Sequence, residues 1–184
     1  MSQEESKNAL NKSHDDLLRK ELETELKYEL IDGELVLMSG GTGFHNAIAA
    51  NLISIFKRIF KDTKCVVFSS DMRLKVEKKN SFNYYYPDVS VQCKEINSNE
   101  VEIENPFLLV EVLSKSTAST DKVKKLNDYL NIEELNGYLI IDQWTRRIEL
   151  WRSFDDMEIY NSGEQINISE NLNFNVDEVY EGLF

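Results

Sequence analysis

The sequence predicts an α+β fold with an α/β-like core, in which a curved mixed sheet is flanked by helices. Three observations support this prediction. Residues 28–38 show the alternation and the Asp-Gly turn of a β-hairpin. Residues 44–61 have the apolar spacing of an amphipathic helix, and residues 107–142 form a strand–helix–strand unit. Extended and helical periodicities therefore alternate along one chain.

The first part of the chain combines a polar arm, a hairpin and a helix. Residues 1–25 are predicted to be a polar arm with helical character over LLRKELETEL. The hairpin at 28–38 turns at Asp32-Gly33, because a tight two-residue turn needs positive φ. The GGTG sequence at 40–43 lacks the GK[ST] ending of a phosphate-binding loop, so we interpret it as a turn. The apolar stripe of the following helix consists of Phe44, Ile48, Leu52, Ile55, Phe56 and Ile59.

The middle of the chain contains several strand-like runs. Residues 65–70 and 72–77 are either two strands or one bent strand, and KKNSFN is a polar turn. Residues 84–93 are predicted to form a strand that is entered through Pro87, which suits the start or the edge of a sheet. The run PFLLVEVL at 106–113 is typical of a central strand covered on both faces.

The last part begins with a helix over residues 116–132, for which the Ser/Thr cluster offers an N-cap. Residues 137–143 predict another buried strand, and residues 146–153 alternate and pair with it through a short turn. Residues 157–169 indicate a further hairpin or strand, and residues 174–184 a short closing helix.

Length and composition limit the class of protein. The 184 residues fit one folded domain, which we place at 26–184, and hydrophobic residues make up 41% of the chain. No apolar run reaches the roughly 18 residues of a membrane span, and the polar N-terminus is not a signal peptide. Cys65 and Cys93 show no CxxC spacing, so we expect neither a disulfide nor a zinc site, and a cytoplasmic location. The net charge of -12 counts against a general nucleic-acid-binding surface, but not against an enzyme that approaches phosphates through a metal.

A carboxylate inside an apolar strand is the first sign of a functional site. Glu111 interrupts the run LLVEVL, and burying an unpaired charge costs several kcal/mol. Glu111 could face water, pair with a buried Lys or Arg, or bind a metal ion in a cleft. Asp88 follows Pro87 in the preceding strand, and strands joined by one loop are often neighbours. Two carboxylates side by side would repel each other unless a cation lay between them, and oxygen ligands suit Mg2+ or Mn2+.

The helix that follows Glu111 brings lysines towards the same place. Lys122, Lys125 and Tyr129 are one turn apart and share a helix face. Lys125 lies at the boundary of the packed side, from which it could reach the carboxylates and stabilise charge in a transition state. The alternative is that the lysines of this run form a solvated face.

An ordered set of motifs resembles a known family. Pro87-Asp88, Glu111 in VEVLSKST, the helix DKVKKLNDY, and the strands YLIIDQ and IELWR together resemble the Uma-two family of restriction endonucleases. That family belongs to the PD-(D/E)XK nuclease superfamily. The likeness extends over roughly residues 26–184 and includes YELIDGELVLM, the helix near His45 and the closing VYEGLF.

The resemblance implies a restriction-endonuclease-like core that cleaves DNA, with Asp88 and Glu111 as ligands of Mg2+, for which Mn2+ can substitute. The usual lysine of the superfamily lies two residues after the acid, where this chain has Leu113, and its counterpart here is Lys125. Glu34 resembles the extra acidic residue that many such nucleases carry. His45 resembles a recurring position without an assigned role. A homodimer is expected by analogy. The competing hypothesis, which the net charge favours, is a DNA-binding or protein-interaction module with a weak or idle site.

Overall fold

The computed structural model describes residues 3–113, 120–170 and 172–184. The helices are α1 (Gln3–Thr24), α2 (Gly43–Ile59), α3 (Thr120–Leu130) and α4 (Val176–Val179). The strands are β1 (Tyr28–Ile31), β2 (Glu34–Leu37), β3 (Val66–Ser69), β4 (Arg73–Lys78), β5 (Ser81–Tyr85), β6 (Val89–Gln92), β7 (Glu102–Ile103), β8 (Leu108–Leu113), β9 (Gly137–Asp142), β10 (Arg147–Ser153), β11 (Asp156–Asn161), β12 (Gln165–Ser169) and β13 (Leu172–Asn175).

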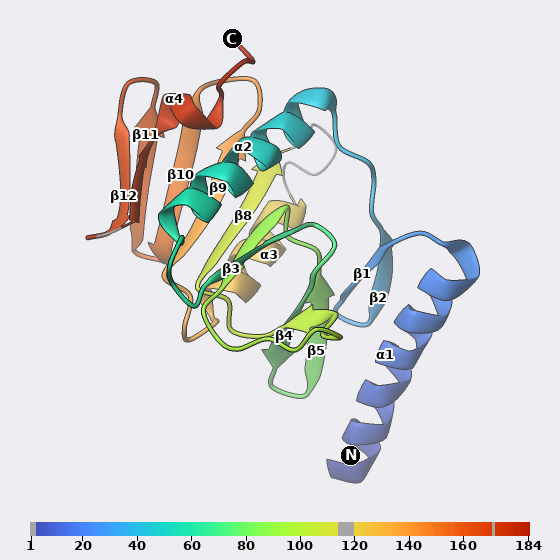
Figure 1. Cartoon of the computed structure of the whole chain (residues 1–184). Coiled ribbons are helices and arrows are strands. Elements are labelled where there is room, and N and C mark those ends of the chain that lie inside the picture. Colours follow the sequence, from blue (N-terminus) through green and yellow to red (C-terminus); the bar gives the residue numbers. More distant parts are fainter. Residues whose placement is uncertain (1–2, 114–119, 171) are drawn as a thin grey trace.

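The strands are divided between sheets, where the sequence had suggested one curved sheet. The large sheet has the order β11-β10-β9-β8-β6-β3, and the small sheet has the order β2-β1-β5-β4-β7 (Figure 1). Both are mixed: β8 and β9 pair in parallel around α3, β4 and β7 pair in parallel, and the other pairs are antiparallel. The mixed α+β architecture predicted from the sequence is therefore confirmed.

Two boundaries differ from the sequence interpretation because the chain changes sheets there. Residues 65–70 and 72–77 are not one bent strand, since β3 lies in the large sheet and β4 in the small sheet. The strand expected at 84–93 is also divided: β5 begins at Ser81 in the small sheet, and β6 begins at Val89 in the large one. Tyr86, Pro87 and Asp88 form the crossing between the sheets. Period-two alternation continues across such a crossing, so it does not mark the change of sheet.

The predicted hairpin and helices are present where they can be described. β1 and β2 pair around Asp32 and Gly33, whose φ angles are +53° and +87°. α2 starts after Thr42, whose hydroxyl accepts the His45 N–H at 3.2 Å as an N-cap. The Ser/Thr cluster expected to cap α3 lies mostly at 114–119, outside the described residues.

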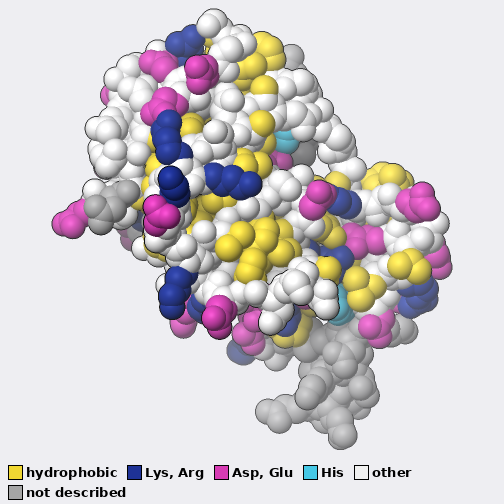
Figure 2. Space-filling model, in the orientation of Figure 1, with side chains coloured by type: hydrophobic (Ala, Val, Ile, Leu, Met, Phe, Trp, Pro, Cys, Tyr) yellow, Lys and Arg dark blue, Asp and Glu magenta, His cyan; other side chains and the backbone are white. Residues whose placement is uncertain are grey.

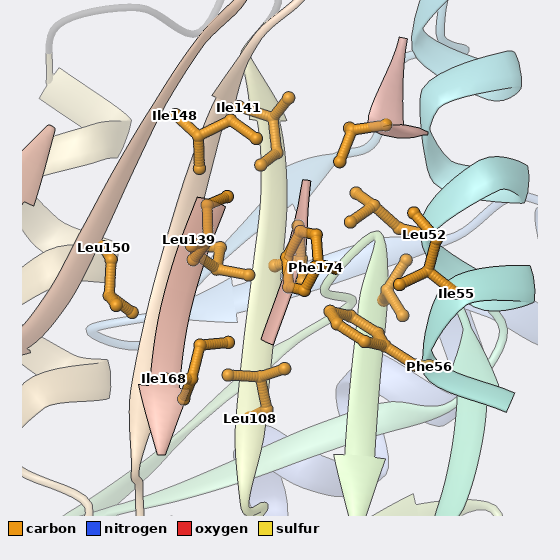
Figure 3. Close-up of a cluster of buried hydrophobic side chains, with 14 of the residues drawn as sticks. Leu52, Ile55, Phe56, Leu108, Leu139, Ile141, Ile148, Leu150, Ile168 and Phe174 are labelled. Atoms are coloured by element: carbon orange, nitrogen blue, oxygen red, sulfur yellow. The ribbon is translucent and has the colours of Figure 1, made fainter. Parts of the chain in front are cut away.

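One face of the large sheet carries an apolar core beneath α2. Leu52, Ile55 and Phe56 of α2 point towards side chains of the sheet and of the β12–β13 hairpin, as Figure 3 shows. The residues of β8 alternate: Leu108, Val110 and Val112 belong to this core, whereas Leu109 packs in the cluster under α3. By the same alternation Glu111 points to the α3 side, which is how a carboxylate fits in this apolar strand.

The N-terminal segment expected as a polar arm forms α1, which packs against the small sheet (Figure 1). Leu17 is fully buried with Leu30 and Tyr84, and the His14 ring stacks on Tyr84 at 4.8 Å between centroids. Buried Arg73 of β4 donates to Glu21 of α1 at 2.6 Å and to Glu102 of β7 at 2.8 Å. The described part of α1 is therefore held by both apolar and ionic contacts.

The expectation that the cysteines stay unpaired is wrong, because Cys65 and Cys93 form a disulfide. They flank the antiparallel pair β3–β6, in which Val66 is opposite Gln92, so the next residues outward also face each other. The sequence did not show this pairing, because a separation of 28 residues carries no motif. No helix in the described parts of the chain is long and apolar enough to cross a membrane.

Candidate active site

A cavity at the junction of the two sheets brings together most of the predicted site residues. Figure 2 shows a hollow between the surface over α2 and the surface over β1 and β2. Asp88, Glu111 and Lys125 line the cavity, together with His45 at the start of α2 and Glu29 of β1. The remaining lining comes from β2, the glycine loop after it, Tyr86, the end of β8 and Tyr138.

Asp88 is held in place from two directions. Its Oδ2 accepts the backbone N–H of Val112 at 2.7 Å and lies 3.1 Å from His45 Nε2. The first contact is possible because β6 and β8 are neighbours in the large sheet, as the sequence predicted. Asp88 and Glu111 therefore face one cavity from adjacent strands.

Glu111 is bonded by the helix that follows it. Its Oε1 accepts from Lys125 Nζ at 3.1 Å and from the Tyr129 hydroxyl at 3.0 Å. Burial raises the pKa of Glu111 to about 8; Lys125 opposes this rise, and the charges of Asp88 and Glu29 add to it. Glu111 therefore pairs with a lysine and is also repelled by neighbouring carboxylates, two possibilities that the sequence analysis considered separately.

Lys125 bridges two carboxylates. Its Nζ is 2.9 Å from Glu29 Oε1 and 3.1 Å from Glu111 Oε1, and its side chain is only 10% exposed. The neighbouring Lys124 is exposed and pairs with Asp32 at 3.3 Å. The lysine run is therefore divided: Lys124 lies on a solvated face, whereas Lys125 enters the cavity. The side chain of Lys122 lies outside the described residues.

Glu29 is a site residue that the sequence interpretation missed, and Glu34 lies elsewhere. Glu29 is buried, lines the cavity and accepts the Tyr86 N–H at 3.2 Å. Glu34 is exposed at the start of β2 and does not line the cavity. The signal that could have found Glu29 is the one that drew attention to Glu111, a carboxylate within an apolar strand, here YELI.

His45 is fitted tightly into the wall of the cavity. Its Nδ1 is buried and has no hydrogen-bond partner among the described residues, while Nε2 faces Asp88. The hydrogen bond to Asp88 raises the pKa of His45, and burial opposes that rise. Gly41 leaves room for the ring, since a Cβ there would lie 2.4 Å from Nδ1. The role of Gly41 is thus to admit the imidazole beside Asp88.

A second polar network anchors α3 one turn beyond Lys125. Asp128 is buried and accepts from the Tyr85 hydroxyl at 2.7 Å and from Asn83 Nδ2 at 2.6 Å, and it forms an ion pair with Lys78. Although burial opposes ionisation, these donors hold the pKa of Asp128 below its ordinary value. The network joins α3 to β4 and β5, and so helps to hold Lys125 and Tyr129 in position beside Glu111.

The donor set of the cavity fits a hard divalent cation. Three carboxylates line the cavity, together with one lysine and one histidine. In the described ranges no three His, Cys, Asp or Glu side chains are arranged as a ready metal cluster. Mg2+ commonly uses one or two carboxylates and retains several waters, which Asp88 and Glu111 satisfy. A closed zinc site would need more protein ligands.

Comparison with known proteins shows which sequences this chain resembles. A family profile described as "Putative restriction endonuclease", Uma2, matches residues 14–177. Two uncharacterised proteins of Synechocystis are similar: one is 37% identical over 145 residues, covering 77% of this chain and 80% of the relative, and the other is 33% identical over 163 residues, covering 85% of each.

The fold is similar to that of a solved structure. A crystal structure from Anabaena variabilis, titled as "a putative nuclease belonging to DUF820", superposes with a TM-score of 0.71 at 18% identity. The match covers 85% of this chain and 91% of that one. At this identity the likeness establishes the restriction-endonuclease-like fold.

Proposed function

The chain belongs to the Uma2 family of restriction-endonuclease-like proteins, and from this premise we propose that it is a Mg2+-dependent endonuclease that hydrolyses phosphodiester bonds of DNA. The observation that carries the proposal is the constellation of Asp88, Glu111 and Lys125. The two carboxylates face one cavity from neighbouring strands, and Lys125 reaches the same cavity from α3. The family and the fold support a nuclease, and the charge of the cavity supports the cation.

In this proposal each residue of the cavity has a distinct task. Asp88 and Glu111 would hold Mg2+, or Mn2+ in its place, which would polarise the scissile phosphate and lower the pKa of a bound water. Lys125 Nζ stands beside Glu111 and donates to the attacking water or to a phosphate oxygen, whose added negative charge it stabilises. Tyr129 fixes the orientation of Glu111. Glu29 holds Lys125 from the opposite side.

The electrostatics favour cation binding over a structural ion pair. Burial is the main cause of the raised pKa of Glu111; Lys125 opposes the rise, and the negative charges of Asp88 and Glu29 add to it. A divalent cation would remove the repulsion and keep Glu111 ionised at neutral pH. Cation binding near neutral pH should therefore release a proton from the protein.

The proposal is tested by calorimetric titration with Mn2+ of the wild type, of Asp88→Ala and of Asp71→Ala. Asp71 is a matched control, because it is highly exposed and pairs with Lys27 away from the cavity. We expect binding in the wild type and in Asp71→Ala, and at least a tenfold weaker association in Asp88→Ala. Cleavage of DNA, measured on a single strand and on a plasmid, should follow the same order. Metal-dependent cleavage that persists in Asp88→Ala would remove Asp88 from the site.

The net charge of -12 favours a second candidate, a nuclease-fold module with an idle site that binds DNA or a partner protein. Mn2+ binding without cleavage of any DNA form would support this module. The homodimer expected by analogy stays a proposal, which analytical ultracentrifugation of the wild type would test.

A further inference from the structure

One wall of the cavity is apolar, and its residues have no role in the proposed hydrolysis. Val36, Leu37 and Met38 line it, and Val36 and Leu37 are 44% and 52% exposed. They belong to β2 and the residue after it, at the outer edge of the small sheet. Exposed aliphatic side chains in a catalytic cavity indicate contact with an apolar part of the substrate.

The register of the hairpin shows which side chain faces the site. Val36 is directly opposite Glu29, and cross-strand partners project from the same face, so Val36 shares the cavity face with a buried site carboxylate. Leu35 is opposite Leu30, which is packed against α1, and therefore lies on the other face of the same strand. Val36 and Leu35 are therefore a matched pair: they are adjacent and similarly exposed, but Val36 lines the cavity and Leu35 does not.

Charge around the cavity opposes a duplex. Of the described lining residues, Lys125 and His45 are the basic ones, and each contacts a carboxylate. Duplex DNA carries one negative charge per about 1.7 Å of its axis, twice the density of a single strand, so an acidic protein repels it more strongly. In a duplex the faces of the bases are also stacked and cannot reach the apolar wall. An unpaired nucleotide meets less repulsion and can place its base there.

We propose that the site accepts an unpaired nucleotide at the scissile phosphate, with its base packed against Val36 and the neighbouring apolar wall. The substrate class is therefore single-stranded DNA, or the unpaired part of a branched or gapped molecule. This inference rests on the proposed function for the position of the phosphate, and adds the form of nucleic acid that the site selects.

The test compares Val36→Asp with Leu35→Asp in the full-length chain. Both add one negative charge at neighbouring positions of β2, so their long-range effects on DNA are matched. Fluorescence anisotropy would measure the binding of one labelled oligonucleotide, single-stranded or annealed to its complement, with Ca2+ as an oxygen-preferring cation. We expect the single strand to bind the wild type at least about tenfold more tightly than the duplex. Val36→Asp should lose about tenfold of that affinity, and Leu35→Asp no more than about twofold.

The outcomes separate this inference from the proposed function. Equal binding and equal cleavage of single strand and duplex would overturn the inference and leave the nuclease intact. Loss of single-strand affinity in Val36→Asp alone, in a protein that cleaves nothing, would support the inference and reject the nuclease. A change in mass by ultracentrifugation in Val36→Asp, without a change in affinity, would assign β2 to contact between copies and overturn the inference. If Val36→Asp does not fold, Val36→Ser against Leu35→Ser makes the same comparison with a smaller expected loss.

Discussion

The two faces of the large sheet are built from different chemistry. Under α2 the sheet meets Leu52, Phe56 and their neighbours in an apolar cluster (Figure 3). Under α3 a second apolar cluster, which includes Leu109 and Ile140, lies beside a polar network. In this network Lys125, Asp128 and Tyr129 bond to Glu111, Tyr85 and Asn83. The same strand, β8, supplies both faces by alternation.

The difference assigns stability to one face and function to the other. An apolar layer gains free energy from burial without leaving charges to be satisfied. In the α3 layer Glu29, Lys125 and Asp128 are buried and Glu111 is nearly so. Such an arrangement is at best neutral for stability in comparison with well-packed apolar residues. Beside these groups the rings of Tyr129 and Tyr138 pack edge to face, with 5.0 Å between their centroids. In such a low-dielectric environment charge interactions are stronger than in water.

The largest effect should come from the apolar layer. Phe56→Ala removes a fully buried ring that contacts Phe174 edge to face at 5.6 Å between centroids. We expect the free energy of unfolding to fall by about 3–5 kcal/mol, because burial is lost and a cavity remains. Chemical denaturation would measure it, and Mn2+ affinity at a temperature where the variant is folded should be unchanged. Loss of Mn2+ binding in the folded variant would show that the two faces are not independent.

A substitution in the polar layer should lower the rate of DNA cleavage. Lys125→Ala removes the cation between Glu29 and Glu111, and we expect DNA cleavage to fall about 100-fold, as for the loss of one charge-stabilising donor. Lys124→Ala is the control, because its exposed side chain pairs with Asp32 outside the cavity. Rates of cleavage under saturating Mn2+ would be compared. Equal rates for Lys125→Ala and Lys124→Ala would show that Lys125 has no role in cleavage and only forms structural ion pairs.

A smaller effect should appear in the pH dependence of the cation-free protein. The folded state keeps the proton of Glu111 up to a pKa of about 8, whereas the unfolded chain releases it near the ordinary 4.5. Between these values the folded state binds more protons, so stability falls as pH rises, by at most about 1.4 kcal/mol per pH unit. The pKa of His45 is also raised, so its contribution to the stability of the folded protein is likewise lost as pH rises, at the upper end of this window.

Comparison with Glu111→Gln isolates the contribution of Glu111. The difference in unfolding free energy between the wild type and this variant should change between pH 4.5 and 8 in EDTA, and level off below that window. Urea unfolding at several pH values would measure it. Parallel curves would mean that the folded protein holds Glu111 ionised without a metal, contrary to the comparison of the two faces.

The local elements and the central pair of acids could be read from the sequence because they depend on short-range patterns. Asp-Gly gave the hairpin, apolar spacing gave α2, and a carboxylate in an apolar strand gave Glu111. The division into two sheets at Tyr86-Pro87-Asp88 could not be read, since strand alternation is the same in either sheet. The Cys65–Cys93 pair depends on the register between β3 and β6, which a sequence of this kind leaves open.

The smallest expected effect concerns the two glutamates of the hairpin. Glu34 was proposed as a site residue from the family resemblance, whereas Glu29 was identified from the geometry of the cavity. Glu34 is exposed at the outer strand, so Glu34→Ala should change stability by less than about 0.5 kcal/mol and leave cleavage unaltered. Glu29→Ala removes the buried partner of Lys125 and should slow cleavage, because Lys125 loses one of the two contacts that hold it beside Glu111. Cleavage rates and denaturation of both variants would be measured side by side. A fall in activity for Glu34→Ala alone would mean that the hairpin moves in the active protein so that Glu34 replaces Glu29, and that the α3 face is completed only when DNA is bound.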